Sequence, residues 1–114
     1  MIYANEGQYQ KMSQGEIGER MAAYRGFLEA LNKAGVYKAS GRLQTSSNAA
    51  TVRVANGKTQ VLNGPYADSR EQLGGFFLID VPDLDAAISW AARCPGASDG
   101  AMEVRPIWQM PANT

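Results

Sequence analysis

Histidine is missing from the 114-residue sequence, and cysteine occurs once, as Cys94. Without histidine the chain lacks the commonest general base, the commonest zinc ligand and every serine–histidine or cysteine–histidine pair. We therefore expect no transition-metal site. A single cysteine allows no internal disulfide, which suits a reducing cytoplasm, and Cys94 is more simply a packing residue than a reactive one.

An excess of one charge and a long apolar run are missing too. Eleven basic and eleven acidic residues cancel, which disfavours direct binding to nucleic acid or to an anionic membrane surface. No apolar run approaches the roughly 20 residues that span a bilayer, and no signal-peptide pattern opens the chain. The 45% apolar content is ordinary for a globular protein, so we expect one domain over residues 1–114.

The first half of the sequence predicts a strand, a long helix and a second strand. Segment 1–4 resembles the end of a strand and is short for a complete one. Ser13 and Glu16 have the spacing of a capping box, in which each side chain bonds the other residue's backbone N–H. Apolar residues then recur at steps of three and four as far as Gly35, which predicts a helix over about 14–34. A strand is expected over 36–43.

The middle of the sequence predicts a β-hairpin. Segments 51–54 and 59–62 alternate between apolar and polar residues. Asn56 and Gly57 lie between them and supply the two positive-φ positions of a type I′ turn. A short helical turn is expected over 69–73.

The second half predicts a strand, a helix and a strand. Gly74-Gly75 precedes an apolar strand over 76–81, which we expect to be covered on both faces. Asp83 is a natural N-cap for the next helix, Pro95-Gly96 ends it, and the last strand is expected over 102–107. With the hairpin left out, this order predicts an α+β fold, a ferredoxin-like split βαβ sandwich with an inserted β-hairpin.

Several segments of the second half together resemble one known family. They are Asn63-Gly64-Pro65-Tyr66-Ala67-Asp68, Glu71-Gln72-Leu73-Gly74-Gly75-Phe76-Phe77-Leu78-Ile79-Asp80-Val81, Asp83-Leu84-Asp85-Ala86-Ala87, Trp90-Ala91-Ala92 and Glu103-Val104-Arg105-Pro106-Ile107. In this order they resemble the YCII-related family, and specifically its DGPF-domain branch. The resemblance extends back through the hairpin and the first helix, so it covers almost the whole chain.

The resemblance implies a dimeric α/β-barrel fold, a cytoplasmic bacterial protein and no dedicated cofactor. Most members of this branch have no known function, and some are encoded beside, or fused to, alternative sigma factors. The chain departs from the pattern at Asn63 and Tyr66, where the branch's motif has Asp and Phe. The YCII side of the family has a His–Asp pair proposed as catalytic, which a chain without histidine cannot carry.

Asp80 is the most suggestive carboxylate, because it shares a strand face with Phe76 and Leu78 in a run that looks buried. A buried carboxylate must be paired or have a raised pKa, which makes Asp80 a weak candidate for a general acid or base. It also lies at a strand end, where solvent or the next helix could satisfy it. Arg105 either pairs with Glu103 on the same strand face or anchors an anionic ligand.

A small-molecule cavity is expected between the sheet and the helices or at a subunit junction, where loops meet. The residues expected to line it are Tyr66, Asp68, Gln72, Asp80 and Arg105. Three functions stay open on these residues. They are a small-molecule binding or regulatory module without catalysis, a cofactor-free enzyme on small polar organic substrates, and an accessory partner of an alternative sigma factor. The missing nucleophile–base pairs favour the first, and the sequence does not decide whether the protein is an enzyme.

A homodimer is expected from the strand over 76–81. Its two faces are apolar, and the two predicted helices can cover only one face of the sheet. Leaving several large apolar residues in water exposes a patch larger than monomers usually tolerate. A second identical sheet is the simplest cover for the open face.

Overall fold

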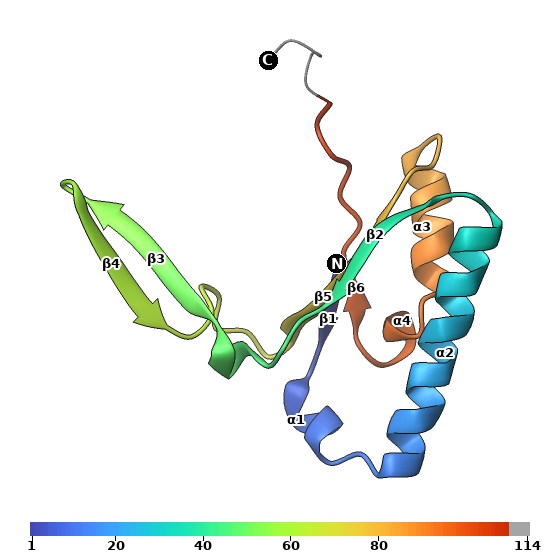
Figure 1. The fold of residues 1–114 in the computed structure, drawn as a ribbon, viewed down its shortest axis with the longest axis horizontal. Helices are drawn as coiled ribbons and strands as arrows, with labels where there is room; N and C mark the ends of the chain where they lie inside the picture. Colours follow the sequence, from blue (N-terminus) through green and yellow to red (C-terminus); the bar gives the residue numbers. More distant parts are fainter. Residues whose placement is uncertain (110–114) are drawn as a thin grey trace.

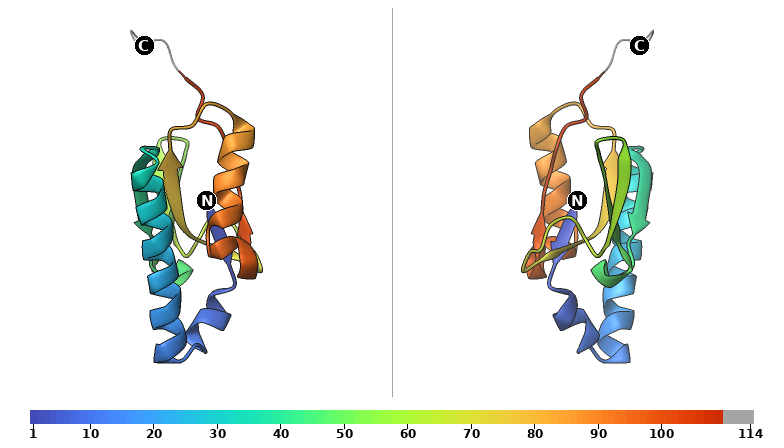
Figure 2. Two further views of the ribbon diagram at one scale, coloured as in Figure 1. Left: turned by 90° about the vertical axis from the view of Figure 1, so that its right-hand side faces the viewer. Right: turned by 90° about the vertical axis from the view of Figure 1, so that its left-hand side faces the viewer.

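The computed structural model describes residues 1–109 and contains a four-stranded antiparallel sheet in the order β2-β5-β1-β6. Its elements are β1 (Ile2–Ala4), α1 (Glu6–Gln10), α2 (Gln14–Lys33), β2 (Tyr37–Arg42), β5 (Gln72–Ile79), α3 (Leu84–Arg93), α4 (Gly96–Asp99) and β6 (Ala101–Met102). The long helices α2 and α3 lie on the same side of this sheet (Figures 1 and 2). The order and the antiparallel pairing are consistent with the predicted ferredoxin-like α+β fold. No closed barrel is formed by the described part of the single chain.

The predicted first helix is confirmed as α2. Ser13 Oγ accepts from the Glu16 N–H at 3.1 Å, and Glu16 Oε1 accepts from the Ser13 N–H at 3.3 Å, so the capping box is present. The short helix α1 was not predicted, although Asn5 caps it by accepting from the Gly7 N–H at 2.9 Å. Together α1 and α2 form the connection between β1 and β2.

The hydrophobic core lies between the sheet and the two long helices. Leu31 and Phe27 of α2 pack with Ile2 of β1 and with Cys94, and Leu31 is fully buried. The Phe27 ring meets the Phe77 ring of β5 edge to face at 5.1 Å between centroids. The prediction that Cys94 is a packing residue agrees with its 1% exposure.

Strand β5 differs from the prediction in its start and in its cover. It begins at Gln72, so the expected helical turn over 69–73 is wrong, and Gly74-Gly75 lies inside the strand. A Cβ on Gly75 would come within 2.7 Å of the Gly41 carbonyl oxygen, so the glycine permits a close approach of β2 and β5. Phe76 and Leu78 are 39% and 37% exposed, so in the single chain only one face of β5 is covered.

The predicted hairpin is confirmed as β3 (Ala50–Ala55) and β4 (Lys58–Asn63), which follow a 3-10 turn, η1 (Ser46–Asn48). Asn56 and Gly57 have φ values of 52° and 74°, as the type I′ turn requires. The hairpin forms a separate two-stranded sheet that projects from the body on the side away from α2 and α3 (Figure 1).

The end of the chain differs from the prediction in two places. Pro95-Gly96 does end α3, but the chain turns at once into the short helix α4, which the sequence did not predict. The expected strand over 102–107 is wrong in its extent, because β6 pairs only over Ala101–Met102 and the residues that follow run on without further strand. None of the helices over residues 1–109 is both long enough and apolar enough to cross a membrane.

Candidate functional site

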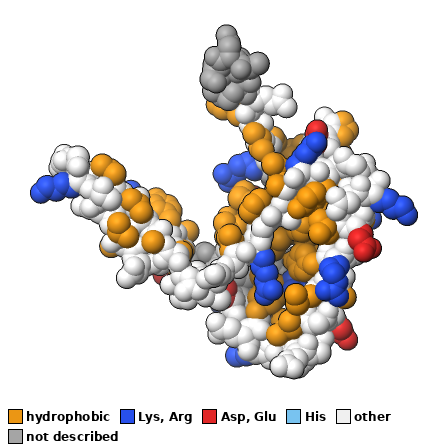
Figure 3. All heavy atoms as spheres, viewed as in Figure 1, with side chains coloured by type: hydrophobic (Ala, Val, Ile, Leu, Met, Phe, Trp, Pro, Cys, Tyr) orange, Lys and Arg blue, Asp and Glu red, His pale blue; other side chains and the backbone are white. Residues whose placement is uncertain are grey.

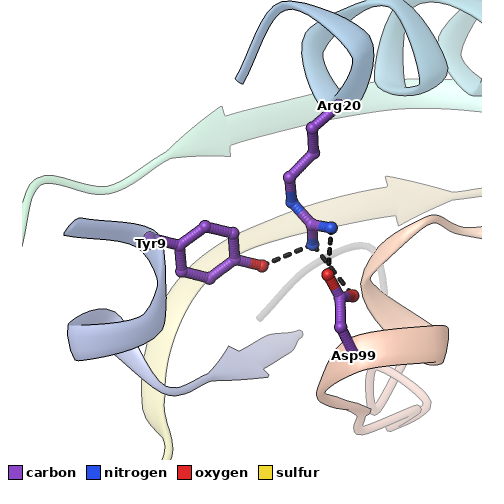
Figure 4. Close-up of polar contacts among 3 residues, drawn as sticks. All are labelled: Tyr9, Arg20 and Asp99. Atoms are coloured by element: carbon purple, nitrogen blue, oxygen red, sulfur yellow. Dashed lines mark hydrogen bonds and ion pairs between the residues drawn. The ribbon is translucent and has the colours of Figure 1, made fainter. Parts of the chain in front are cut away.

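A cluster of three polar side chains joins α1, α2 and α4. Arg20 of α2 donates from Nη2 to the Tyr9 hydroxyl of α1 and, at 3.1 Å, to Asp99 Oδ1 at the end of α4. Its Nη1 forms a second contact with Asp99 Oδ2 (Figure 4). The guanidinium is therefore held by a bidentate carboxylate and a phenol, a geometry that fixes its orientation.

Aromatic rings flank the Arg20 guanidinium. Its central carbon lies 4.7 Å from the centroid of the Tyr9 ring and 5.4 Å from that of Tyr24. Burial opposes the positive charge, but the Asp99 hydrogen bond and the neighbouring tyrosines outweigh it and raise the pKa of Arg20 above its ordinary value. The Arg20 side chain is 16% exposed and stays charged. Through its contacts with Tyr9 and Asp99 it joins α2 to α1 and α4.

Burial also shifts two tyrosines and the cysteine beside this cluster. It raises the pKa of Tyr9, and it raises the pKa of Tyr24 to about 12, with the nearby Cys94 adding to the shift of Tyr24. It raises the pKa of the Cys94 thiol as well, although the Gly96 backbone and the Tyr24 hydroxyl act in the opposite direction. Neutral phenols and a neutral thiol therefore surround the charged pair at ordinary pH.

A hollow of about 270 Å³ opens beside the Arg20–Asp99 pair, and it is lined by Gln8, Tyr9, Met12, Glu16 and Asp99. Arg20 neutralises Asp99, which leaves Glu16 as the uncompensated charge of the hollow. Glu16 uses Oε1 in the cap of α2, and its other oxygen remains an acceptor. The hollow thus offers acceptor groups and one aromatic ring, an arrangement that suits a small ligand carrying hydrogen-bond donors.

A larger groove, of about 420 Å³, lies between α3 and the chain around β6, and its lining is apolar. The lining residues are Ile88, Ala91, Ala92, Ala97, Met102 and Val104. Small-molecule sites combine apolar walls with a few placed polar groups, and no side chain of this lining is polar. The hollow beside Arg20 is therefore the better candidate for a ligand site.

The raised tyrosine pKa values predict a loss of stability at alkaline pH. An unfolded tyrosine releases its proton near its ordinary pKa of about 10, whereas folded Tyr24 holds its proton to about 12. Between pH 10 and 12, loss of the tyrosine proton therefore stabilises the unfolded state relative to the folded state. The free energy of unfolding should fall over this range. Tyr24→Phe should reduce this fall in urea titrations at successive pH values. Tyr66→Phe, at a three-quarters exposed position, should leave the fall unchanged, and equal slopes in both variants would contradict the prediction.

The residues that the sequence proposed as ligand contacts lie apart in the single chain. Gln72 and Asp80 stand at opposite ends of β5, which for eight residues means about 25 Å. Tyr66 and Asp68 precede β5 in an exposed turn, where the Arg53 guanidinium lies 5.1 Å from the centre of the Tyr66 ring. Their role as ligand contacts stays a prediction, and no cavity described for residues 1–109 brings them together.

Three of these residues have local contacts. Gln72 accepts from the Glu6 N–H at 3.0 Å and donates to the Ser69 carbonyl at 2.8 Å, so it supports the base of the hairpin. Asp80 is exposed, so the expectation that it is buried is wrong for the single chain, because the face it shares with Phe76 and Leu78 is uncovered. Arg105 forms an ion pair with Glu103. This agrees with the alternative in which Arg105 pairs with Glu103 rather than anchoring an anionic ligand.

Comparison with known proteins places the chain in a family. Residues 1–111 match the YCII-related domain, so the chain belongs to the YCII-related family. An uncharacterised protein of Rhizobium meliloti (strain 1021) is 46% identical over 68 residues, which is 58% of this chain and 55% of that protein. The match thus spans about half the length of this relative. The family and the relative give no activity, so the function is argued from the site.

Sequence reasoning missed Tyr9, Arg20 and Asp99. Arg20 and Asp99 are 79 positions apart, and Asp99 reaches Arg20 only because α4 folds back toward α2. One signal was present, since Asn5 is a good helix N-cap and would have predicted α1, the helix that carries Tyr9.

Proposed function

We propose that this YCII-related protein is a small-molecule binding module without catalysis, and that its ligand occupies the hollow beside the Arg20–Asp99 pair. The observation that carries the proposal is the convergence of Tyr9, Glu16 and Asp99 on one hollow next to groups with shifted pKa values. Perturbed titratable groups around a concavity are typical of functional sites. The ligand class that fits is a small polar molecule with an ammonium or hydroxyl group, because the hollow presents acceptors and one net negative charge.

The absence of catalysis is supported by how the charged groups are used. The Arg20 guanidinium and the Asp99 carboxylate are committed to each other, and the chain has no histidine to serve as a base near neutral pH. A cofactor-free enzyme using Tyr66 or Asp80 has less support, since Tyr66 precedes β5 and Asp80 follows it. A role beside an alternative sigma factor rests on the family resemblance alone.

Ligand-detected NMR with a panel of primary amines, amino acids and polyols tests the proposed binding. Members of the panel that bind should lose affinity in Met12→Trp, which fills the hollow, and in Glu16→Gln, which removes its net charge. Glutamine still forms a capping box, so Glu16→Gln should leave α2 intact. Glu19→Gln, which removes a charge of the same sign outside the hollow, is the matched control. Silence of the whole panel, or binding unchanged in Met12→Trp, contradicts the proposal.

Three finer assignments remain proposals as well. The DGPF branch is supported by the turn at Asn63-Gly64-Pro65-Tyr66, where Gly64 has a φ of 110° that glycine accommodates best. The dimeric α/β barrel and a cytoplasmic location follow from the family resemblance and the absence of a disulfide pair. The uncovered face of β5 further supports pairing of two copies.

A further inference from the structure

The short helix α1 belongs to two features at once, the candidate ligand hollow and the root of the β3–β4 hairpin. Gln8 and Tyr9 are part of the lining of the hollow. Glu6, the first residue of the helix, is bonded to Ser46, shortly before β3 begins. Figure 1 shows α1 between the hairpin root and the start of α2. The helix therefore connects the candidate ligand site with a projecting element.

The end of α1 at the hairpin root is fixed by hydrogen bonds of Glu6. Its carboxylate accepts from the Ser46 N–H at 2.7 Å and from the Ser46 hydroxyl at 2.8 Å. Its backbone N–H donates to the Gln72 side chain at 3.0 Å, and the Gln72 amide donates to the Ser69 carbonyl at 2.8 Å. Ser46 lies before the hairpin, and Ser69 and Gln72 follow it. One residue of α1 thus holds the chain on both sides of the hairpin.

The end of α1 at the hollow is held by Arg20. Its Nη2 donates to the Tyr9 hydroxyl, and its guanidinium carbon lies 4.7 Å from the centroid of the Tyr9 ring. Tyr9 and Glu6 are less than one helical turn apart, about 4.5 Å along the helix axis. Groups this close on one turn do not move independently. A displacement of the wall of the hollow therefore also displaces Glu6.

Helix α1 is lightly packed against the rest of the protein. It has no buried residue, and Glu6 and Tyr9 are half-buried. Helix α2, in contrast, buries Phe27 and Leu31 in the core. Segments with few buried apolar contacts open at a small free energy, whereas core elements open only with the whole domain. A ligand can therefore change the position of α1 at little cost while α2 stays in place.

The hairpin depends on its root for order. It pairs with no strand of the main sheet, and every residue of 50–63 except Thr51 is exposed. Figure 3 shows it joined to the body by a narrow neck. A two-stranded hairpin alone is at best marginally stable in water. Contacts at the root, such as the bond from the Gly64 N–H to the Ala49 carbonyl at 2.7 Å, therefore limit fraying from the open end of the hairpin.

We propose that α1 couples the hollow to the β3–β4 hairpin, so that a ligand bound in the hollow orders the hairpin root. The inference rests on the proposed function, because it needs a ligand in the hollow. A ligand that contacts Gln8 and Tyr9 restricts α1, and Glu6 then keeps its bonds at the root for a larger fraction of the time. Coupling of two sites is reciprocal, so a partner that holds the hairpin strengthens ligand binding by the same factor.

Tyr9→Phe tests the coupling without a ligand. It removes the hydroxyl that Arg20 holds and keeps the aromatic ring, so α1 should loosen while the fold is kept. Backbone amides of the hairpin near its root, over 50–52 and 61–63, should then exchange with solvent faster. Loss of one hydrogen bond predicts a rate about 3–10-fold higher, which amide hydrogen exchange followed by NMR measures.

Two controls accompany this test. Tyr37→Phe also removes a hydroxyl hydrogen bond, the one to Ser40 within β2, and should leave hairpin exchange unchanged. In Tyr9→Phe, amides beside the Asn56-Gly57 turn should change less than those near the root, because the loosening begins at the root. Hairpin exchange that is the same in Tyr9→Phe and Tyr37→Phe overturns the coupling.

Ethanolamine tests the coupling with a ligand, because it carries both an ammonium and a hydroxyl group. At saturation it should shift the NMR signals of Gln8 and Glu16 and slow exchange of the root amides about 3–10-fold, the effect of about one hydrogen bond. In Glu6→Ala the shifts at the hollow should remain, because Glu6 is not part of its lining, and the slowing should be lost. Glu29→Ala, at an exposed position of α2, is the matched control and should keep both effects.

Far-UV circular dichroism checks that each variant is folded. Bound ethanolamine that leaves hairpin exchange unchanged overturns the coupling and leaves the proposed binding intact. Slowing that persists in Glu6→Ala overturns it too, because α1 is then not the connection. If ethanolamine shifts no signal of the hollow, the proposed ligand class is contradicted, and the comparison of Tyr9→Phe with Tyr37→Phe decides the coupling.

Discussion

Leu31→Ala should lower the free energy of unfolding by about 2–5 kcal/mol. Leu31 is 0% exposed and lies where α2 meets Ile2, Phe27 and Cys94. Removing its branched end loses the transfer energy of the buried carbons and leaves a cavity that close-packed neighbours fill only in part. Few side chains of the described residues are fully buried, so the rest of the core has little with which to compensate.

Urea unfolding followed by circular dichroism measures this loss, and Leu84→Ala is its control. Leu84 begins α3 and is 46% exposed, so the same chemical change there should cost well under half as much. Equal losses at the two positions would contradict the assignment of Leu31 to the centre of the core. Both variants should be compared at one protein concentration, because the apparent stability of any protein that self-associates depends on its concentration.

The elements that the sequence predicted well are those with local physical signals. The capping box of Ser13 and Glu16 fixed the start of α2, and the Asn56-Gly57 turn fixed the hairpin, because each depends on residues within a few positions. The N-cap at Asp83 was predicted for the same reason, and its side chain accepts from the Ala86 N–H at 2.8 Å. From such local signals and the order of elements, the split βαβ arrangement followed.

The start of β5 and the length of β6 could not be predicted in this way. Gly74-Gly75 has the composition of a turn, yet Gly75 lies in a strand because it pairs with Ile2 of β1 and Arg42 of β2, and its lack of a side chain permits the close approach of Gly41. The segment after Met102 has the alternating composition of a strand, but pairing with β1 covers only Ala101 and Met102 and is followed, within the described residues, by backbone hydrogen bonds between Met1 and Glu103 alone. Strand extent depends on the neighbour, and the sequence of one strand does not contain that information.

The candidate site was harder to predict than the fold. Arg20 lies on α2 among other polar residues, and nothing in its neighbours marks it as the partner of a carboxylate 79 positions away. Asp80, in contrast, was singled out because its strand is apolar, and it is exposed because β5 has cover on one side only. Burial of a strand residue depends on which face of the sheet is covered. When both faces of a strand carry apolar residues, its sequence does not tell which face that is.

Gly100→Ala should cost at least about 1–3 kcal/mol of folding free energy, because a Cβ at this position has no room. It would lie 2.1 Å from the Tyr3 carbonyl oxygen and 3.2 Å from the Tyr3 carbonyl carbon. These are backbone atoms of β1, which pairs with both β5 and β6 and cannot move alone. Gly100 also ends α4, so the displacement should shift Asp99 and loosen its contact with Arg20.

Gly18→Ala is the matched control for Gly100→Ala. Gly18 lies within α2, and no atom stands within 4 Å of a Cβ built there. The substitution should therefore stabilise the helix by about 0.5–1 kcal/mol, since alanine loses less backbone entropy than glycine. A loss of stability in Gly100→Ala together with a gain in Gly18→Ala would show that the loss comes from the steric clash with β1 and is not a general effect of alanine. If Gly100→Ala unfolds at the same urea concentration as wild type, α4 does not pack on β1 as closely as this structure requires, and the Asp99 side of the candidate site would have to be placed differently.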